Sequence, residues 1–337
     1  MAKHVLFVHD NRSLGGVAAV SHQLAEALVT RGWAVDHWHL GNVAAGAARL
    51  RRLVRERGVL LATQNFSASY VAAGVAQICR RPWVMCVHGP VWKVLEFGRA
   101  GRRKRDFLAW LYRRTPTIVC SSRASLDSLL EFCPSAALRP RLAVIRNTAN
   151  PAFFASPRVE TATGSRDIGF VGRLSPEKQP LDLLDTLRAL PAAYRLHVVG
   201  SGPLQASLAE QGRHEIAAGR LLLAGTAAVS AQTYRQWRAT LLCSAYEGYP
   251  LALLESLASG VPVASTPIPP AVEMLGRHAP YMLAASAAPA ALARTVEDLL
   301  AADAQAVARD IASINAEHDP GAFADEWDAL LSGCLRT

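Results

Sequence analysis

The sequence lacks the features that mark secreted, metal-binding or membrane-spanning proteins. Its 337 residues include six cysteines but no CxxC pair, which argues against disulfides and zinc ligands. No uncharged apolar run has the length and hydropathy of a membrane span, and the apolar run before His9 has only four residues, too few for a signal peptide. We therefore expect a cytoplasmic protein without a metal ion.

The fingerprint of nicotinamide dinucleotide binding is also missing. The strand expected at 5–9 leads into a loop whose only glycines are Gly15 and Gly16, with no GxGxxG before the next helix. A dehydrogenase is therefore a poor candidate. A strand, a glycine loop and a helix N-terminus still suit a phosphate group, because the first helical N–H groups are unpaired. A glycine turn that only packs helix on strand explains the loop equally well.

Acidic residues are scarce in the first half of the chain, which is strongly basic. Up to residue 160 there are 23 Lys and Arg against 9 Asp and Glu, whereas the remainder has 13 against 18. The densest cluster runs from Arg99 to Arg114 and includes Phe107 and Trp110. This segment suits an anionic membrane surface or a polyanionic acceptor, and a solvated helix with one buried face fits it equally well. Nucleic acid is disfavoured, because no recognition module accompanies the charge.

Short apolar runs alternate with helical patterns along the whole chain. The alternation predicts an α/β protein of two doubly wound domains, since 337 residues exceed a usual single domain. We place the domains at 1–150 and 151–319, followed by a C-terminal helix at 320–337 whose packing against the first domain is left open. The strand-like runs are 5–9, 35–40, 59–62, 82–87, 117–121, 142–145, 167–171, 195–199, 221–223, 241–243 and 261–264.

The stretch 239–272 carries only two charges, Glu247 and Glu255. A strand is expected before Glu247, and a helix should begin near Pro250, where proline is tolerated, and end at Gly260. Glu255 lies in that apolar helix, and a buried carboxylate needs a hydrogen-bonding or charged partner. Glu247 follows the carboxyl end of a strand, where open α/β sheets bind ligands.

Two cations and a histidine follow other predicted strands. Arg173 and Lys178 come after the strand at 167–171 and suit a diphosphate, because arginine gives forked hydrogen bonds and lysine a mobile charge. A surface ion pair of Lys178 with Glu177 or another neighbour is the alternative. His88 ends the strand at 82–87 and is placed to face a cleft, although a lone histidine is more often structural.

In their order along the chain, these motifs resemble the retaining glycosyltransferases of family 4, the glycogen-synthase-like group 1 enzymes. The most specific motif is Glu247 followed by Glu255 in EGYPLALLESLASGVPV, and the next is VGRLSPEK, which contains Arg173 and Lys178. The resemblance implies a GT-B fold, in which two Rossmann-like doubly wound domains face a cleft. It makes the first domain the acceptor-binding one and the second the nucleotide-sugar-binding one. Weaker matches in the family's order are Gly15-Gly16, His88-Gly89, Ser121-Ser122, Asn147 and Gly200-Ser-Gly202.

The resemblance also implies residue roles. Arg173 and Lys178 would bind the diphosphate and stabilise the leaving group. Glu255 would accept hydrogen bonds from the ribose, and Glu247 would contact the donor sugar. The remaining implied substrate contacts are His88 to the sugar or acceptor, Gly15 and Gly16 by close approach to the diphosphate, and the backbone of Gly248, Tyr249, Pro250 and Leu251 at the phosphates.

One segment departs from the family pattern. Residues 266–273 place three prolines after the last motif strand, where relatives often have a glycine pair. We expect these prolines to lie in a loop, with Glu273 beginning or preceding the next helix. A changed loop reshapes the donor pocket, so the donor sugar stays open.

The sequence therefore predicts a retaining, metal-independent hexosyltransferase that needs no cofactor. Its donor would be a UDP- or GDP-sugar, and its acceptor a lipid-linked glycan or glycolipid of lipopolysaccharide, exopolysaccharide or another envelope polysaccharide. A peripheral position on the inner face of the cytoplasmic membrane is left open by the basic segment. The alternatives are a transferase with a small soluble acceptor, and a catalytically idle GT-B subunit that binds a nucleotide sugar or a partner transferase.

Overall fold

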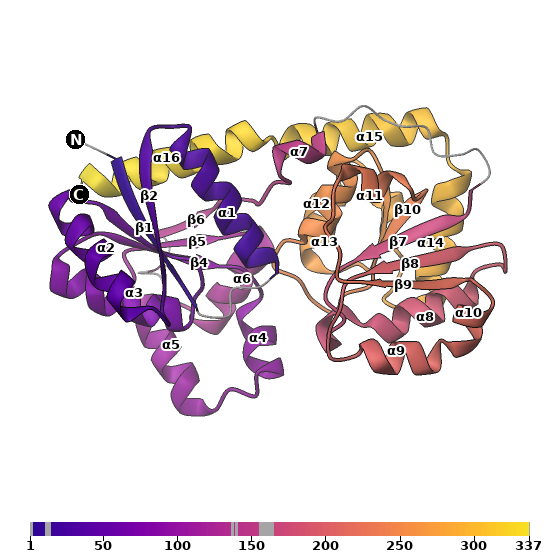
Figure 1. Ribbon diagram of the computed structural model, residues 1–337, viewed down its shortest axis with the longest axis horizontal. Coiled ribbons are helices and arrows are strands. Elements are labelled where there is room, and N and C mark those ends of the chain that lie inside the picture. Colours follow the sequence, from indigo (N-terminus) through magenta and orange to yellow (C-terminus); the bar gives the residue numbers. More distant parts are fainter. Residues whose placement is uncertain (1–2, 11–14, 136–137, 139–140, 155–164, 337) are drawn as a thin grey trace. The chain divides into compact units, whose positions relative to one another are not determined.

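The computed structural model describes residues 3–10, 15–135, 138, 141–154 and 165–336. The chain divides into two compact units, of which the first combines Met1–Asn147 with Pro320–Thr337 and the second is Thr148–Asp319 (Figure 1). Each unit is built on one parallel sheet, which confirms the predicted α/β class. Part of the loop expected between the first strand and Gly15, residues 11–14, lies outside the described residues.

The sheet of the first unit has the order β2-β1-β3-β4-β5-β6, and all its pairs are parallel. The order reverses between β1 and β3, so the loops that follow these two strands flank the place where open sheets bind ligands. The strands are β1 (Lys3–His9), β2 (Trp33–His39), β3 (Val59–Ala62), β4 (Trp83–Val87), β5 (Thr117–Cys120) and β6 (Leu142–Val144).

Helices cover both faces of this sheet, because alternate side chains of the buried strands are apolar in both directions (Figure 1). One face packs on α1 (Gly16–Val29) and α16 (Pro320–Arg336). The other packs on α2 (Val43–Arg55), α3 (Ser67–Cys79), α5 (Arg102–Arg114) and α6 (Arg123–Phe132), and α4 (Val91–Phe97) lies against α6.

The C-terminal helix α16 is part of the core of the first unit. Trp327 and Leu331 are buried in the same cluster as Phe7 of β1. Asp328 anchors the helix, since it accepts hydrogen bonds from Lys3 Nζ at 2.8 Å and from Trp33 Nε1 at 2.7 Å. The last residues of the chain thus pack on the first strands.

The second unit has the strand order β11-β10-β7-β8-β9, again all parallel. Its order reverses between β7 and β10, which places the switch point between the two strands that carry the predicted site motifs. The strands are β7 (Asp167–Val171), β8 (Arg195–Val199), β9 (Leu221–Gly225), β10 (Ala239–Leu242) and β11 (Val263–Ser265). The helices are α7 (Pro151–Phe154), α8 (Pro180–Ala189), α9 (Gln205–Gln211), α10 (Arg213–Ala217), α11 (Ala231–Arg235), α12 (Leu251–Ala258), α13 (Pro269–Leu275), α14 (Pro289–Ala301) and α15 (Ala304–Glu317), with short 3₁₀ turns η2 (Pro176–Lys178) and η3 (Pro280–Met282).

The expectation for residues 266–273 was wrong. Pro269 and Pro270 are the first residues of α13, and Glu273 lies inside that helix instead of at its start. The physical reason is that proline tolerates the first helical turn, whose N–H groups have no intrahelical partner. Only Pro267 remains in the loop.

Two glycines let the loops after β7 and β8 touch. Gly200 has a positive φ of 141°, and a Cβ there would lie 1.9 Å from the carbonyl oxygen of Gly172. The Leu174 N–H then donates to the Ser201 carbonyl at 3.0 Å. The motif Gly200-Ser-Gly202 therefore supports the loop that carries Arg173.

Gly169, in the middle of β7, lies against the indole of Trp237. A Cβ at this position would sit 1.9 Å from a ring atom, whereas a Cβ on Gly74 in α3 would meet nothing within 4 Å. We expect Gly169→Ala to lower the free energy of unfolding by about 1–3 kcal/mol, and Gly74→Ala to raise it by up to about 1 kcal/mol. Urea denaturation measures both, and equal stability of the two variants would contradict the packing.

Candidate functional site

An ion pair joins the two predicted motifs at the switch point of the second unit. Lys178, in η2 after β7, donates to Glu247, in the loop after β10, across 69 positions of sequence. Both side chains are largely withdrawn from solvent, at 22% and 13% exposure. Ser244 also donates to Glu247, at 2.7 Å. The cation and the carboxylate that the sequence placed in separate motifs therefore form one cluster.

The backbone holds these two loops together. The Ala245 N–H donates to the Glu177 carbonyl at 2.8 Å, and the Cys243 thiol donates to the Lys178 carbonyl at 3.1 Å. The Glu177 side chain instead accepts from the Ser175 hydroxyl. Lys178 thus forms a long-range ion pair with Glu247 and not the local pair with Glu177 that was the alternative.

Arg173 lies two residues beyond β7 and is exposed. Its guanidinium makes no hydrogen bond or ion pair with the described part of the chain, so its five donors are open to a ligand. Of the two predicted cations, Lys178 is therefore held by a carboxylate, whereas Arg173 is available to a ligand.

Helix α12 begins at Leu251, with Pro250 as its N-cap residue, one residue later than predicted. Its first N–H groups have no intrahelical partner, and they make the helix start suitable for an anion. The Tyr249 side chain is buried, and its ring stacks on His318 with a centroid distance of 5.6 Å. Only the backbone of Tyr249 is placed for the predicted substrate contact.

Glu255 on α12 has a hydrogen-bonding partner, as expected for a carboxylate in apolar surroundings. The Tyr234 hydroxyl, on α11, donates to Glu255 Oε2 at 2.7 Å. Burial raises the pKa of Glu255 to about 6, and the Tyr234 hydrogen bond opposes part of that rise. Tyr234 uses one carboxylate oxygen, and the carboxylate is ionised at neutral pH.

The remaining predicted residues belong to the first unit. Gly15 has a φ of 94° and caps α1, which begins at Gly16. His88 follows β4, and burial lowers its pKa to about 4, partly offset by a hydrogen bond to the Thr63 backbone. Its imidazole is therefore neutral at pH 7, and it can donate and accept hydrogen bonds without carrying charge.

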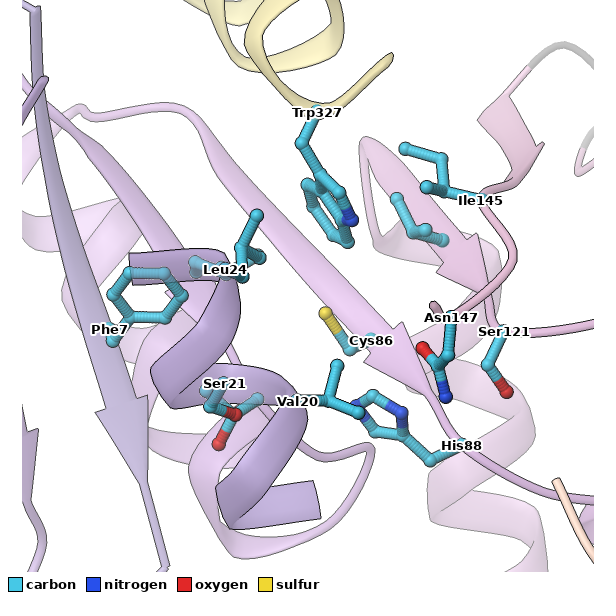
Figure 2. Close-up of a pocket in the computed structure, with 13 residues that line it drawn as sticks. Phe7, Val20, Ser21, Leu24, Cys86, His88, Ser121, Ile145, Asn147 and Trp327 are labelled. Carbon is cyan, nitrogen blue, oxygen red and sulfur yellow. The ribbon is translucent and has the colours of Figure 1, made fainter. Parts of the chain in front are cut away.

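His88 opens onto a pocket in this unit. The pocket lies between α1, α16 and the carboxyl ends of β3 to β6, and Figure 2 shows His88, Ser121 and Asn147 at the strand ends, with the Trp327 indole entering from α16. Its other lining residues are Phe7, Val20, Ser21, Leu24, Leu61, Thr63, Cys86, Val119 and Ile145.

Sequence reasoning missed the partners of the predicted residues. Nothing in the local pattern marks Tyr234, Ser244 or Trp327, because each meets its partner through the packing of distant elements. Ser121 and Asn147 had appeared only as weak matches in the family's order. The signal that the sequence does offer is a polar residue directly after some strands, as with Thr63 after β3, His88 after β4 and Ser121 after β5.

Within the described ranges, no three His, Cys, Asp or Glu side chains are arranged to hold a metal ion. No helix in the same part of the chain has both the length and the hydropathy of a membrane span.

Comparison with solved structures gives the class of the fold. Anabaena Alr3699/HepE, in complex with UDP and glucose, matches with a TM-score of 0.75 and 19% identity over 97% of this chain and 99% of that one. The lipopolysaccharide outer core galactosyltransferase WaaB in its apo form matches with a TM-score of 0.67 and 15% identity over 98% and 99%. These likenesses confirm the predicted GT-B fold with two Rossmann-like units.

Comparison of sequences gives the family. Residues 165–302 match the model of the family "Glycosyl transferases group 1". The chain is 27% identical to glycogen synthase of Mycobacterium tuberculosis (strain CDC 1551 / Oshkosh) over 246 residues, 65% of this chain and 55% of that protein. It thus spans about half the length of this curated relative. Residues 165–302, most of the second unit, are thus similar to the group 1 glycosyltransferases, as the motifs had indicated.

The pKa of Glu255 predicts a stability cost for the site. The folded-state pKa of Glu255, about 6, exceeds the usual 4.5, so protonation of this side chain favours the folded state. That stabilisation is fully present below pH 4.5 and is lost as the pH rises through 6. We expect Glu255→Gln to raise the free energy of unfolding at pH 8 by up to about 2 kcal/mol, with a smaller gain at pH 4.

Urea denaturation at the two pH values measures this difference. Glu210→Gln, at an exposed position of α9, is the matched control and should leave the pH dependence unchanged. A destabilised Glu255→Gln variant at pH 8 would show that the carboxylate is favourably paired in the folded protein.

Proposed function

We propose that the protein is a retaining glycosyltransferase that moves a sugar from a UDP- or GDP-sugar to a lipid-linked or envelope-polysaccharide acceptor. The observation that carries the proposal is the cluster of Lys178 and Glu247 at the switch point of a unit that is similar to the group 1 family. Sugar nucleotides carry a diphosphate and a polyol, and this cluster offers a cation and a carboxylate side by side.

In this proposal the second unit binds the donor. Arg173 and Lys178 bind the diphosphate, with the N-terminus of α12 as a further source of positive potential. Glu247 accepts hydrogen bonds from hydroxyls of the sugar, and Glu255 from those of the ribose. The resemblance to the family supplies these roles, and the ion pair and the ionised Glu255 support them.

The chemistry needs stabilisation of negative charge. When the bond between the sugar carbon and the phosphate oxygen breaks, charge develops on the departing diphosphate, and cations fixed beforehand stabilise it. The ion pair with Glu247 holds Lys178 in one orientation before the donor arrives. Such a site needs no metal ion, since the protein supplies the cations.

The first unit would bind the acceptor. His88 is neutral, so it can hydrogen-bond an uncharged hydroxyl of the sugar or the acceptor. The glycine at the start of α1 leaves room for the backbone to approach the diphosphate, as the resemblance implies for Gly15 and Gly16.

A basic aromatic surface on α5 favours an acceptor at a membrane. Leu108 and Leu111 face the core, while Phe107 and Trp110 are 44% and 43% exposed and stack on each other. Arg114 lies over the Trp110 ring at 4.5 Å. Exposed aromatic rings beside arginines fit the boundary of an anionic bilayer, where the rings enter the headgroup layer and the cations meet phosphates.

Two alternatives remain distinct from this proposal. A transferase with a small soluble acceptor needs no exposed rings on α5. A catalytically idle subunit would bind the donor through the same residues but would neither hydrolyse it nor transfer its sugar.

Substitution of the ion pair separates donor binding from chemistry. We expect Lys178→Ala to lose both the thermal stabilisation by UDP or GDP and the slow hydrolysis of the donor sugar. Glu247→Gln removes the ion-pair partner of Lys178, so UDP or GDP should stabilise this variant against heat by mass action at least as well as it stabilises the unaltered protein. Hydrolysis of the donor should fall by at least about 100-fold.

Glu177→Gln is the matched control, since this neighbouring carboxylate bonds to Ser175. It should retain both properties. If the unaltered protein binds sugar nucleotides from the UDP, GDP and ADP series but never hydrolyses or transfers them, the idle-subunit alternative takes precedence.

Flotation with liposomes tests the acceptor side. We expect binding to vesicles that contain anionic lipid, weaker binding at high salt, and loss of binding in the double variant Phe107→Ser, Trp110→Ser. Ile216→Ser in α10 removes an apolar side chain of the second unit that is 39% exposed, and it should change nothing. Absence of binding by the unaltered protein would favour a soluble acceptor.

A further inference from the structure

The pocket beside His88 is lined by two residues with buried polar atoms that the described part of its own unit does not satisfy. Ser121 and Trp327 are each 4% exposed. Ser121 Oγ and Trp327 Nε1 find no hydrogen-bond partner among the described residues. The two residues come from β5's carboxyl end and from α16, and both line the pocket (Figure 2).

Other hydroxyls of the same pocket behave differently. Ser21 donates to the Val17 carbonyl at 2.8 Å, and Thr63 donates to the Val8 carbonyl at 3.1 Å. Buried polar atoms in folded proteins almost always have partners, so two unpaired ones on residues that line the same pocket call for an explanation. An indole N–H can only donate and a hydroxyl can do both, which together match a ligand hydroxyl.

The pocket carries no charge. None of its lining side chains is acidic or basic apart from His88, which is neutral at pH 7. Phosphate or carboxylate would enter without a compensating cation, at a high desolvation cost. The apolar walls, among them Val20, Leu24 and Cys86, suit the C–H groups of a ligand.

We propose that this pocket binds a hydroxyl or hydroxymethyl group of an uncharged polyol, with Trp327 Nε1 donating to its oxygen and Ser121 Oγ completing the hydrogen bonds. The space beside these atoms admits a group of about that size, not a whole sugar ring. On the proposed function, this group belongs to the acceptor. Trp327 is then a binding residue supplied by the last helix of the chain.

The indole N–H of Trp327 is a direct reporter. In ¹⁵N-labelled full-length protein, the Trp327→Phe variant identifies its NMR signal by the loss of one resonance. The probes are methyl α-D-glucopyranoside and glycerol, with inorganic phosphate as the charged comparison. We expect both polyols to shift the Trp327 signal saturably in the millimolar range and phosphate to leave it unmoved.

Trp33 is the internal control, because its indole N–H already donates to Asp328 on the same helix. Ser121→Ala should weaken polyol binding about fivefold, the loss of one hydrogen bond. Ser121→Thr keeps a hydroxyl but fills the space with a methyl group, and should also weaken binding. Ser332→Ala, also on α16 but outside the pocket, should not.

A Trp327 signal that no polyol moves overturns the proposal, and the two atoms are then served by ordered water only. A response to phosphate, or equal shifts of Trp33 and Trp327, overturns it as well. These outcomes are independent of donor hydrolysis, which depends on Lys178 in the second unit. If the donor is hydrolysed but polyols do not shift the Trp327 signal, only this inference is rejected. If polyols shift the signal but the donor is not hydrolysed, only the proposed function is rejected.

Discussion

The ion pair between Lys178 and Glu247 is the constraint around which the second unit is arranged. Two partly desolvated charges are stable only in a close, well-bonded geometry, so the loops after β7 and β10 must meet. The backbone bond from Ala245 to Glu177 and the packing of Gly200 on Gly172 hold them there. The same arrangement leaves Arg173 open, which gives the site one fixed cation and one adaptable one.

The buried carboxylate of Glu255 lowers the stability of the folded protein. Glu255 sits in an apolar helix with a pKa of about 6, so its ionised form at neutral pH opposes folding. A neutral side chain would pack there with less cost. A carboxylate that is retained against this cost fits a residue that accepts hydrogen bonds from a ligand. Without a ligand, the Tyr234 hydroxyl donates one hydrogen bond to it.

The first unit depends on the end of the chain as much as on its beginning. Helix α16 packs on the first strands through Asp328, and it brings Trp327 to the strand ends that carry His88 and Ser121. The basic face of α5 belongs to the same unit. In the proposed function, donor binding and acceptor binding therefore belong to separate cores, each with its own sheet.

The sequence by itself determined the alternation of strands and helices, the α/β class and the motif positions, because these follow from local hydrophobic periodicity and from short runs of residues. The sequence pattern wrongly predicted a loop just before Glu273, where two prolines in fact begin α13. Only the tertiary structure decided that Lys178 pairs with Glu247 instead of its neighbour Glu177, that Tyr234 meets Glu255, and that Trp327 lines the pocket of His88. The reason is physical: such contacts join residues far apart in sequence, and the order of strands in each sheet determines which of them meet.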